Sequence, residues 1–264
     1  MKKNDKMIIY FLLSTFLISG IAWGSLILLA RGGQLEFGQP IFMILFMIGG
    51  YGPTFGTFIA IALSEKKPKF SEYWKRLLRF KVSFWYYLSP LVLLMFLGLV
   101  PAIVRGEMST KFSSLVRVLW GTVPALFISS FFFGGLEELG WRGFLQHELQ
   151  KKMKIWLVYP LVWVIWAIWH YPLFHLPGVS QYGQNFWIFS VYALFFSMIL
   201  GWLYGRTHSI PIAILGHTLV NVLSAIGYLN FLGRDNLHWA TFLIVFAVLI
   251  GIHLIWPVER IDQD

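Results

Sequence analysis

The sequence contains no cysteine and little charge. Asp, Glu, Lys and Arg together make up 12% of its 264 residues, against about 25% in soluble domains. The absence of cysteine excludes disulfides, thiolate nucleophiles and cysteine-ligated metal centres. The low charge, 58% hydrophobic residues and a mean hydropathy of +0.69 exclude an ordinary water-soluble domain and a disordered chain. The composition therefore predicts an integral membrane protein.

Long apolar runs recur along the whole chain. A membrane-spanning helix needs about 20 mostly apolar residues, and eight segments meet this requirement. They cover residues 7–30, 41–63, 84–104, 125–146, 155–176, 186–204, 210–228 and 238–257. The first run is too long for a signal-peptide core and is expected to stay as a span. We expect an all-α polytopic membrane protein with about eight transmembrane helices, folded as one integral-membrane domain over residues 1–264.

Positive charge is distributed unevenly between the connecting segments. The formal net charge is +9, and with an even number of spans 16 of the 21 Lys and Arg residues share one side with the N-terminus. Because cytoplasmic loops are enriched in Lys and Arg, both termini are expected in the cytoplasm of a cell-membrane protein. Lys and Arg side chains interact favourably with anionic lipids. The expected partner is therefore a lipid bilayer, and binding to nucleic acid is not expected. The basic stretch 64–83 predicts a short interfacial helix, with substrate docking as the alternative.

The fourth apolar run contains ionisable residues, which cost at least about 2.5–3.5 kcal/mol each at bilayer depth and therefore indicate function. Its sequence is Gly134-Gly-Leu-Glu137-Glu138-Leu-Gly-Trp-Arg142. On a helix, Glu138 and Arg142 share one face and can pair, whereas Glu137 points about 100° away. The alternative is that this segment is the polar end of the span, with an ordinary surface ion pair.

Two further polar motifs lie in later apolar runs. Trp166 and His170 are four residues apart in the fifth run, and His217 and Asn221 are four apart in the seventh. Structural alternatives are an interfacial histidine for the first pair and an interhelical hydrogen bond for the second. With the fourth span centred near Gly135, however, all three motifs fall in one band roughly 10 Å thick. This common depth predicts a polar intramembrane cavity.

A carboxylate, two imidazoles and an amide, without serine or cysteine among them, fit the activation of water. Glu137 with His170 could orient and deprotonate a water molecule. His217 and Asn221 could donate hydrogen bonds to the oxyanion of an attacked carbonyl. Zinc is the alternative, because one Glu and two His can hold it. The chain has no HExxH motif, however, and neither a metal nor another cofactor is expected.

Taken together, Glu137-Glu138-xxx-Arg142, Trp166-xxx-His170 and His217-xxx-Asn221 resemble the motif set of the CAAX prenyl protease and bacteriocin-processing (ABI) family. The motifs cover roughly residues 125–230, and Trp166 stands where phenylalanine is more usual. The resemblance implies an intramembrane peptidase with a cavity open to the cytoplasm. It further implies Glu137 as the water-activating base and His170 as its partner, with His217 and Asn221 stabilising the oxyanion. Glu138, Arg142 and Trp166 would support them.

The resemblance leaves the substrate open, because the family includes CAAX proteases and members linked to bacteriocin maturation or immunity and to signal-peptide processing. The expected partner is a peptide or membrane-anchored protein, which could be prenylated, lipidated or of the bacteriocin or signal type. Two other functions remain as alternatives: a non-catalytic scaffold that binds a peptide without cutting it, and a proton-coupled transporter. Many transporters consist of two halves that resemble each other. The two halves of this chain show no such resemblance.

Overall fold

The protein is a bundle of helices in a computed structural model that describes residues 3–64, 68–106, 108, 113, 116, 122–229, 239–259 and 261. The first helices are α1 (Lys3–Arg31), α2 (Pro40–Gly50), α3 (Gly52–Ala62), α4 (Pro68–Leu77), α5 (Phe84–Arg105) and α7 (Val123–Phe133). After an irregular stretch come α8 (Glu138–Gly140), α9 (His147–Gln150), α10 (Ile155–His170), α11 (Phe186–Thr207), α12 (Ile210–Ala225) and α13 (Trp239–Ile255). The described residues contain no strand, so the all-α prediction is confirmed.

Every predicted apolar run contains helix, although the helices differ in length. Among the described residues, five helical stretches are long and apolar enough to cross a membrane, and the bent pair α2 and α3 would make a sixth span. The helices α12 and α13 have 16 and 17 residues, or roughly 24–26 Å against a hydrocarbon core of about 30 Å. Residue His238, where the last run was predicted to begin, lies outside the described residues.

The second apolar run bends by 49° between α2 and α3. Pro53 lies in the first turn of α3, and a proline ring removes one hydrogen bond and clashes with the carbonyl four residues earlier. That carbonyl belongs to Gly49 and instead accepts a hydrogen bond from Ser19 Oγ of α1 at 2.7 Å. Pro53 therefore bends the helix and does not line the cavity, whereas the neighbouring Gly50 does.

Tryptophan side chains join α1 to the motif-bearing helices. The ring centroids of Trp23 and Trp169 are 4.7 Å apart, and those of Trp169 and Trp141 are 5.4 Å apart. Their polar atoms are paired: Trp169 Nε1 donates to Ser19 Oγ at 2.8 Å, and Trp23 Nε1 donates to the carbonyl of Phe46 at 3.1 Å. Buried indoles need such partners, and these contacts fix α1 and α2 against α10.

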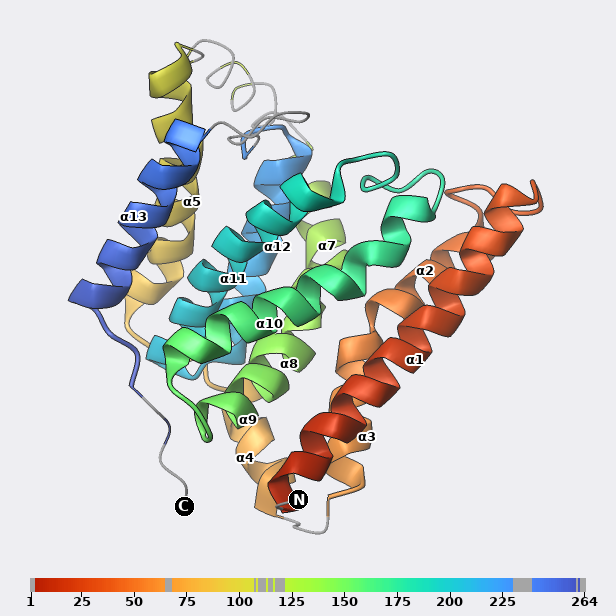
Figure 1. The fold of residues 1–264 in the computed structure, drawn as a ribbon, viewed down its shortest axis with the longest axis horizontal. Helices are drawn as coiled ribbons and strands as arrows, with labels where there is room; N and C mark the ends of the chain where they lie inside the picture. Colours follow the sequence, from red (N-terminus) through yellow and green to blue (C-terminus); the bar gives the residue numbers. More distant parts are fainter. Residues whose placement is uncertain are drawn as a thin grey trace.

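The two ends of the bundle differ (Figure 1). At one end, which we call the near end, α1 and α12 begin and α13 ends, and α4 lies beneath α9. At the opposite end, the far end, α1 ends at Arg31 and residues 171–185 connect α10 to α11. The basic stretch does contain a short helix, α4, at the near end, with Phe70 and Trp74 exposed. Its place at the membrane interface stays a prediction.

Candidate active site

The polar residues of the fourth span sit in irregular backbone. After α7, residues Gly135–Glu137 form a 3₁₀ turn, Glu138–Gly140 an α-turn and Trp141–Gln146 a π-helical turn. The fourth span is therefore helical over the predicted range 125–146, but its helix is irregular from residue 135 onward. Turns of the π type are rare and occur frequently at functional sites. The surface-ion-pair alternative is wrong, because both carboxylates of this segment are buried.

Two glycines let this segment lie directly against α12. A Cβ atom on Gly134 would overlap the amide nitrogen of Asn221, and one on Gly135 would lie 2.5 Å from Thr218 Oγ1. Real Cβ atoms do not make such contacts, so any larger residue would push the two segments apart. The glycines thereby bring the carboxylates next to the imidazole of His217.

We expect Gly134→Ala to lower peptide-cleavage activity about a hundredfold, because the methyl group would displace the Asn221 amide and misplacements near 1 Å cost this much. The measurement is the initial rate of cleavage by purified protein. Gly24→Ala in α1 is the matched control, since a Cβ there would meet nothing within 4 Å. Equal rates for the two variants would contradict the assigned close contact.

Side chains from the N-terminal helices bind carbonyl groups of the irregular segment. Thr54 Oγ1 donates to the carbonyl of Leu136 at 2.9 Å, Tyr73 OH to that of Leu139 at 2.9 Å, and Arg76 Nη2 to that of Gly143 at 3.2 Å. Carbonyls in irregular backbone need such partners when buried. Burial also raises the pKa of Tyr73, which keeps its hydroxyl protonated as the donor. The sequence motifs carry no signal for these three contacts.

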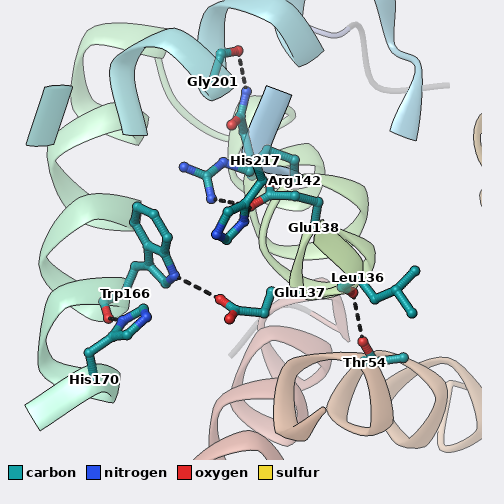
Figure 2. A network of polar contacts seen from close by, with 10 residues as sticks. Thr54, Leu136, Glu137, Glu138, Arg142, Trp166, His170, Gly201 and His217 are labelled. Carbon is teal, nitrogen blue, oxygen red and sulfur yellow. Dashed lines mark hydrogen bonds and ion pairs between the residues drawn. The ribbon is translucent and has the colours of Figure 1, made fainter. Parts of the chain in front are cut away.

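Glu138 is the centre of a buried ion pair (Figure 2). Its Oε1 atom accepts hydrogen bonds from Arg142 Nη1 at 3.0 Å and from His217 Nδ1 at 2.8 Å. The pairing of Glu138 with Arg142 at a spacing of four residues is confirmed. The contact with His217 was not predicted, because it joins residues 79 apart in the chain. The arrangement orients the imidazole through a carboxylate that Arg142 in turn holds.

Glu137 turns away from this pair toward α10 (Figure 2). Its side chain is 7% exposed, and its Oε2 accepts a hydrogen bond from Trp166 Nε1 at 3.1 Å. The same indole lies under the Arg142 guanidinium, 5.0 Å from the ring centroid. Trp166 therefore contacts the Glu137 carboxylate directly, a role that phenylalanine at this position could not fill.

We expect Trp166→Phe to lower kcat about ten- to a hundredfold with KM unchanged, since hydrogen bonds to charged groups contribute about 1.5–3 kcal/mol. The substitution keeps an aromatic ring and removes the donor that orients Glu137. Steady-state kinetics would measure the effect. Trp163→Phe is the control, because that indole donates to the carbonyl of Ser190 at 2.6 Å and not to Glu137. A rise in KM alone would contradict the orienting role.

The two histidines are held in different ways. His170 Nδ1 lies 2.8 Å from the carbonyl of Trp166, which can only accept, so Nδ1 carries the proton and a neutral ring keeps its lone pair on Nε2. His217 is held through Nδ1 by Glu138. The Trp166 ring lies between the imidazoles, with centroids 5.3 Å from His170 and 5.4 Å from His217.

The four residues predicted to be catalytic meet at one cavity of about 80 Å³, whereas the supporting Glu138, Arg142 and Trp166 do not line it. Its wall includes Glu137, His170, His217 and Asn221, together with Trp23, Phe46, Gly50, Phe132, Phe133, Trp169, Leu173 and Gln181. The volume is ample for several water molecules at about 10–15 Å³ each. The sequence analysis missed the contributions of Trp23 and Phe46, because the first two runs contain no polar motif.

The described residues contain no group of three His, Asp or Glu side chains that could hold a metal ion. The nearest arrangement to the zinc alternative would need Glu137 and both histidines. The Nδ1 hydrogen bonds, from His217 to Glu138 and from His170 to a carbonyl, are of the kind that metal-bound histidines also make, so they do not separate the two alternatives. The expectation of chemistry without a metal stays a prediction, and a chelator tests it below.

Comparisons with known proteins bear on the same segment. Residues 119–223 match the family model described as type II CAAX prenyl endopeptidase Rce1-like. The chain is also 28% identical to CAAX prenyl protease 2 of Methanococcus maripaludis over 239 residues, which cover 84% of each chain. The resemblance to CAAX proteases is thereby confirmed, and a membrane protease is supported. Bacteriocin immunity stays a prediction.

Proposed function

Given this similarity to type II CAAX prenyl endopeptidases, we propose that the chain is an intramembrane endopeptidase in which Glu137 activates the attacking water. The observation that carries the proposal is the shared cavity, where a buried carboxylate meets the imidazoles of His170 and His217. The residue roles are those expected from the sequence, with a more direct part for Trp166.

Proton transfer begins at the carboxylate. A water molecule between Glu137 and His170 would donate one proton toward the carboxylate and the other toward His170 Nε2, which the Trp166 carbonyl leaves free as an acceptor. The resulting hydroxide attacks the peptide carbonyl carbon, and Glu137 holds the proton taken from water. When the C–N bond breaks, that proton passes to the leaving nitrogen.

The oxyanion of the intermediate needs hydrogen-bond donors. Asn221 offers its amide N–H groups at the cavity wall. His217 donates from Nδ1 to ionised Glu138, so it donates from Nε2 as well only when it is an imidazolium. Glu138 accepts the Nδ1 hydrogen bond that orients the ring, while Arg142 fixes the carboxylate. Removing one oxyanion donor typically costs 10²–10³ in kcat.

The test uses purified protein in detergent with quenched fluorescent peptides and lipopeptides, including a prenylated CAAX-type peptide and its unprenylated match. We expect defined cleavage products and an unchanged rate after a strong chelator is added. Loss of activity with chelator and its recovery with Zn²⁺ would overturn the proposed glutamate mechanism. Binding of a peptide that stays intact over long incubation would favour the scaffold function instead.

A further inference from the structure

The helix α4 presents an apolar face that the rest of the described protein leaves uncovered. Phe70, Trp74 and Leu78 lie at four-residue spacing, which places them on one side of a helix, and they are 45%, 38% and 65% exposed. The rings of Phe70 and Trp74 pack edge to face, with centroids 5.6 Å apart. We call these three residues the outer face of α4. Neighbouring exposed apolar side chains of this kind indicate an interaction surface.

Positive charge borders the outer face. Among residues 70–83, the exposed charged side chains are Lys75, Arg79, Lys81 and the single carboxylate of Glu72. None of the three cations forms an ion pair with a carboxylate of the described residues. The surface therefore combines apolar side chains with uncompensated cations, which fits a partner that is apolar inside and negatively charged at its boundary.

The position of α4 in the chain indicates what that partner is. The helix lies between two apolar segments, since α3 ends at Ala62 and the apolar helix α5 begins at Phe84. Phe84 and Trp85, in the first turn of α5, are 70% and 71% exposed. A helix that comes directly before a span meets lipid headgroups, among which aromatic rings and cations are both favourable.

The inner side of α4 is bound to the segment that carries the buried ion pair. Tyr73, which is 1% exposed, donates its hydroxyl hydrogen to the carbonyl of Leu139 at 2.9 Å. Arg76 Nη2 donates to the carbonyl of Gly143 at 3.2 Å. These two carbonyls belong to the residues that directly follow the two members of the ion pair in the chain. The position of α4 therefore bears on the backbone beside both charges.

A further hydrogen bond joins α4 to the helix of His217. The carbonyl of Arg79, two residues past the end of α4, accepts it from Ser209 Oγ at 2.7 Å. Ser209 is the N-cap residue of α12, which carries His217. Both partners of the hydrogen bond between His217 and Glu138 thus lie on elements that α4 contacts. A shift of α4 would reach this bond through short, contiguous contacts.

We propose that the outer face of α4 is a docking surface for anionic lipid headgroups, and that docking there positions the irregular segment for catalysis. Lipid phosphates pair with Lys75, Arg79 and Lys81. Tyr73 and Arg76 transmit the position of α4 to the segment and are positioning residues. The docking surface stands independently of the proposed function, whereas its effect on cleavage rests on that function.

Lipid contact is measured without reference to activity. Because the chain contains no cysteine, Ser71→Cys places a single thiol at an exposed position of α4 for a bimane fluorophore. In nanodiscs of mixed phosphatidylcholine and phosphatidylglycerol, we expect spin-labelled phosphatidylglycerol to quench it at least about twofold more than spin-labelled phosphatidylcholine, since each cation near an anionic surface strengthens binding. Replacing Lys75, Arg79 and Lys81 by glutamine should abolish the preference. Equal quenching by the two lipids before that replacement would overturn the docking surface and favour a protein partner.

Cleavage is compared between nanodiscs of phosphatidylcholine alone and nanodiscs that also contain phosphatidylglycerol. The quenched peptide is uncharged, so that the lipid does not concentrate it. We expect kcat to be at least about threefold higher with phosphatidylglycerol, and the variant with three glutamines to lose this gain. Lys154→Gln is the matched control, because it removes an exposed near-end cation outside α4 and should keep the gain.

The outcomes of the two measurements are distinguishable. Equal kcat in both kinds of nanodisc would overturn the effect of docking on catalysis. Cleavage in neither kind, together with selective quenching, would contradict the proposed function while supporting the docking surface.

Tyr73→Phe separates docking from its effect on catalysis. The substitution keeps the ring and removes the hydrogen bond to the carbonyl of Leu139. We expect the selective quenching to remain and the gain in kcat with phosphatidylglycerol to fall by about half or more. An undiminished gain would overturn Tyr73 as a positioning residue. Loss of the selective quenching would overturn the separate roles assigned to the two sides of α4.

Discussion

Glu137→Gln is expected to reduce peptide cleavage by at least about a thousandfold, at the upper range of effects for a general base. The substitution keeps the size of the side chain and an oxygen that can accept the hydrogen bond of Trp166 Nε1. It removes only the capacity to take a proton from water. The loss should appear in kcat with KM little changed, because the amide leaves peptide binding intact.

Two measurements accompany this variant. Thermal unfolding in detergent should be close to that of the unchanged protein, since Glu137 forms no ion pair among the described residues. Glu72→Gln on α4 is the matched control, because it makes the same chemical change at an exposed position and should leave the rate unaltered. Full activity of Glu137→Gln would exclude this residue as the base.

Glu138→Ala is expected to have the largest effect on stability. It leaves the Arg142 guanidinium buried without its carboxylate and removes the partner of His217 Nδ1. Breaking a buried ion pair by deleting one partner costs about 3–5 kcal/mol. At about 2–4 °C per kcal/mol for a chain of this size, the midpoint of thermal unfolding should fall by roughly 6–20 °C. Scanning fluorimetry in detergent would measure it, and an unchanged midpoint would contradict the assigned ion pair.

A double variant separates stability from catalysis. Glu138→Met with Arg142→Met replaces the ion pair by apolar side chains of similar volume, and such replacements are often neutral or stabilising. The thermal midpoint should therefore recover most of the loss seen in Glu138→Ala. Activity should stay low, because His217 no longer has the carboxylate that holds its ring through Nδ1. Recovery of both properties would show that Glu138 acts only through the stability of the fold.

Much of the fold follows from composition and helical spacing. Apolar runs near 20 residues long predict where helices lie, since the bilayer imposes this length on any spanning helix. The face shared by Glu138 and Arg142 follows from the helical repeat, and the structure brings their charges within 3.0 Å. The bend at Pro53 does not follow from the sequence, because a proline alone does not determine whether a helix bends there or turns its side chains toward a cavity.

The parts of the site that escaped prediction depend on contacts between distant helices. The hydrogen bond from His217 to Glu138 requires the close approach that Gly134 and Gly135 allow, and helical spacing carries no such information. The common depth of the motifs did predict that Glu137 and His217 would meet at one cavity. It could not predict the π-helical turn, whose unusual hydrogen bonding depends on donors such as Arg76 from another helix.

The tryptophan and phenylalanine that α1 and α2 contribute to the cavity wall have an evolutionary consequence. Trp23 and Phe46 lie outside the motif-bearing segment, yet they contact the same space as Glu137. Part of the surface around the reacting groups is thus encoded outside the stretch of the gene that carries the motifs. Recombination that exchanged the first 62 residues between relatives could alter which peptides are accepted while every reacting group stayed unchanged.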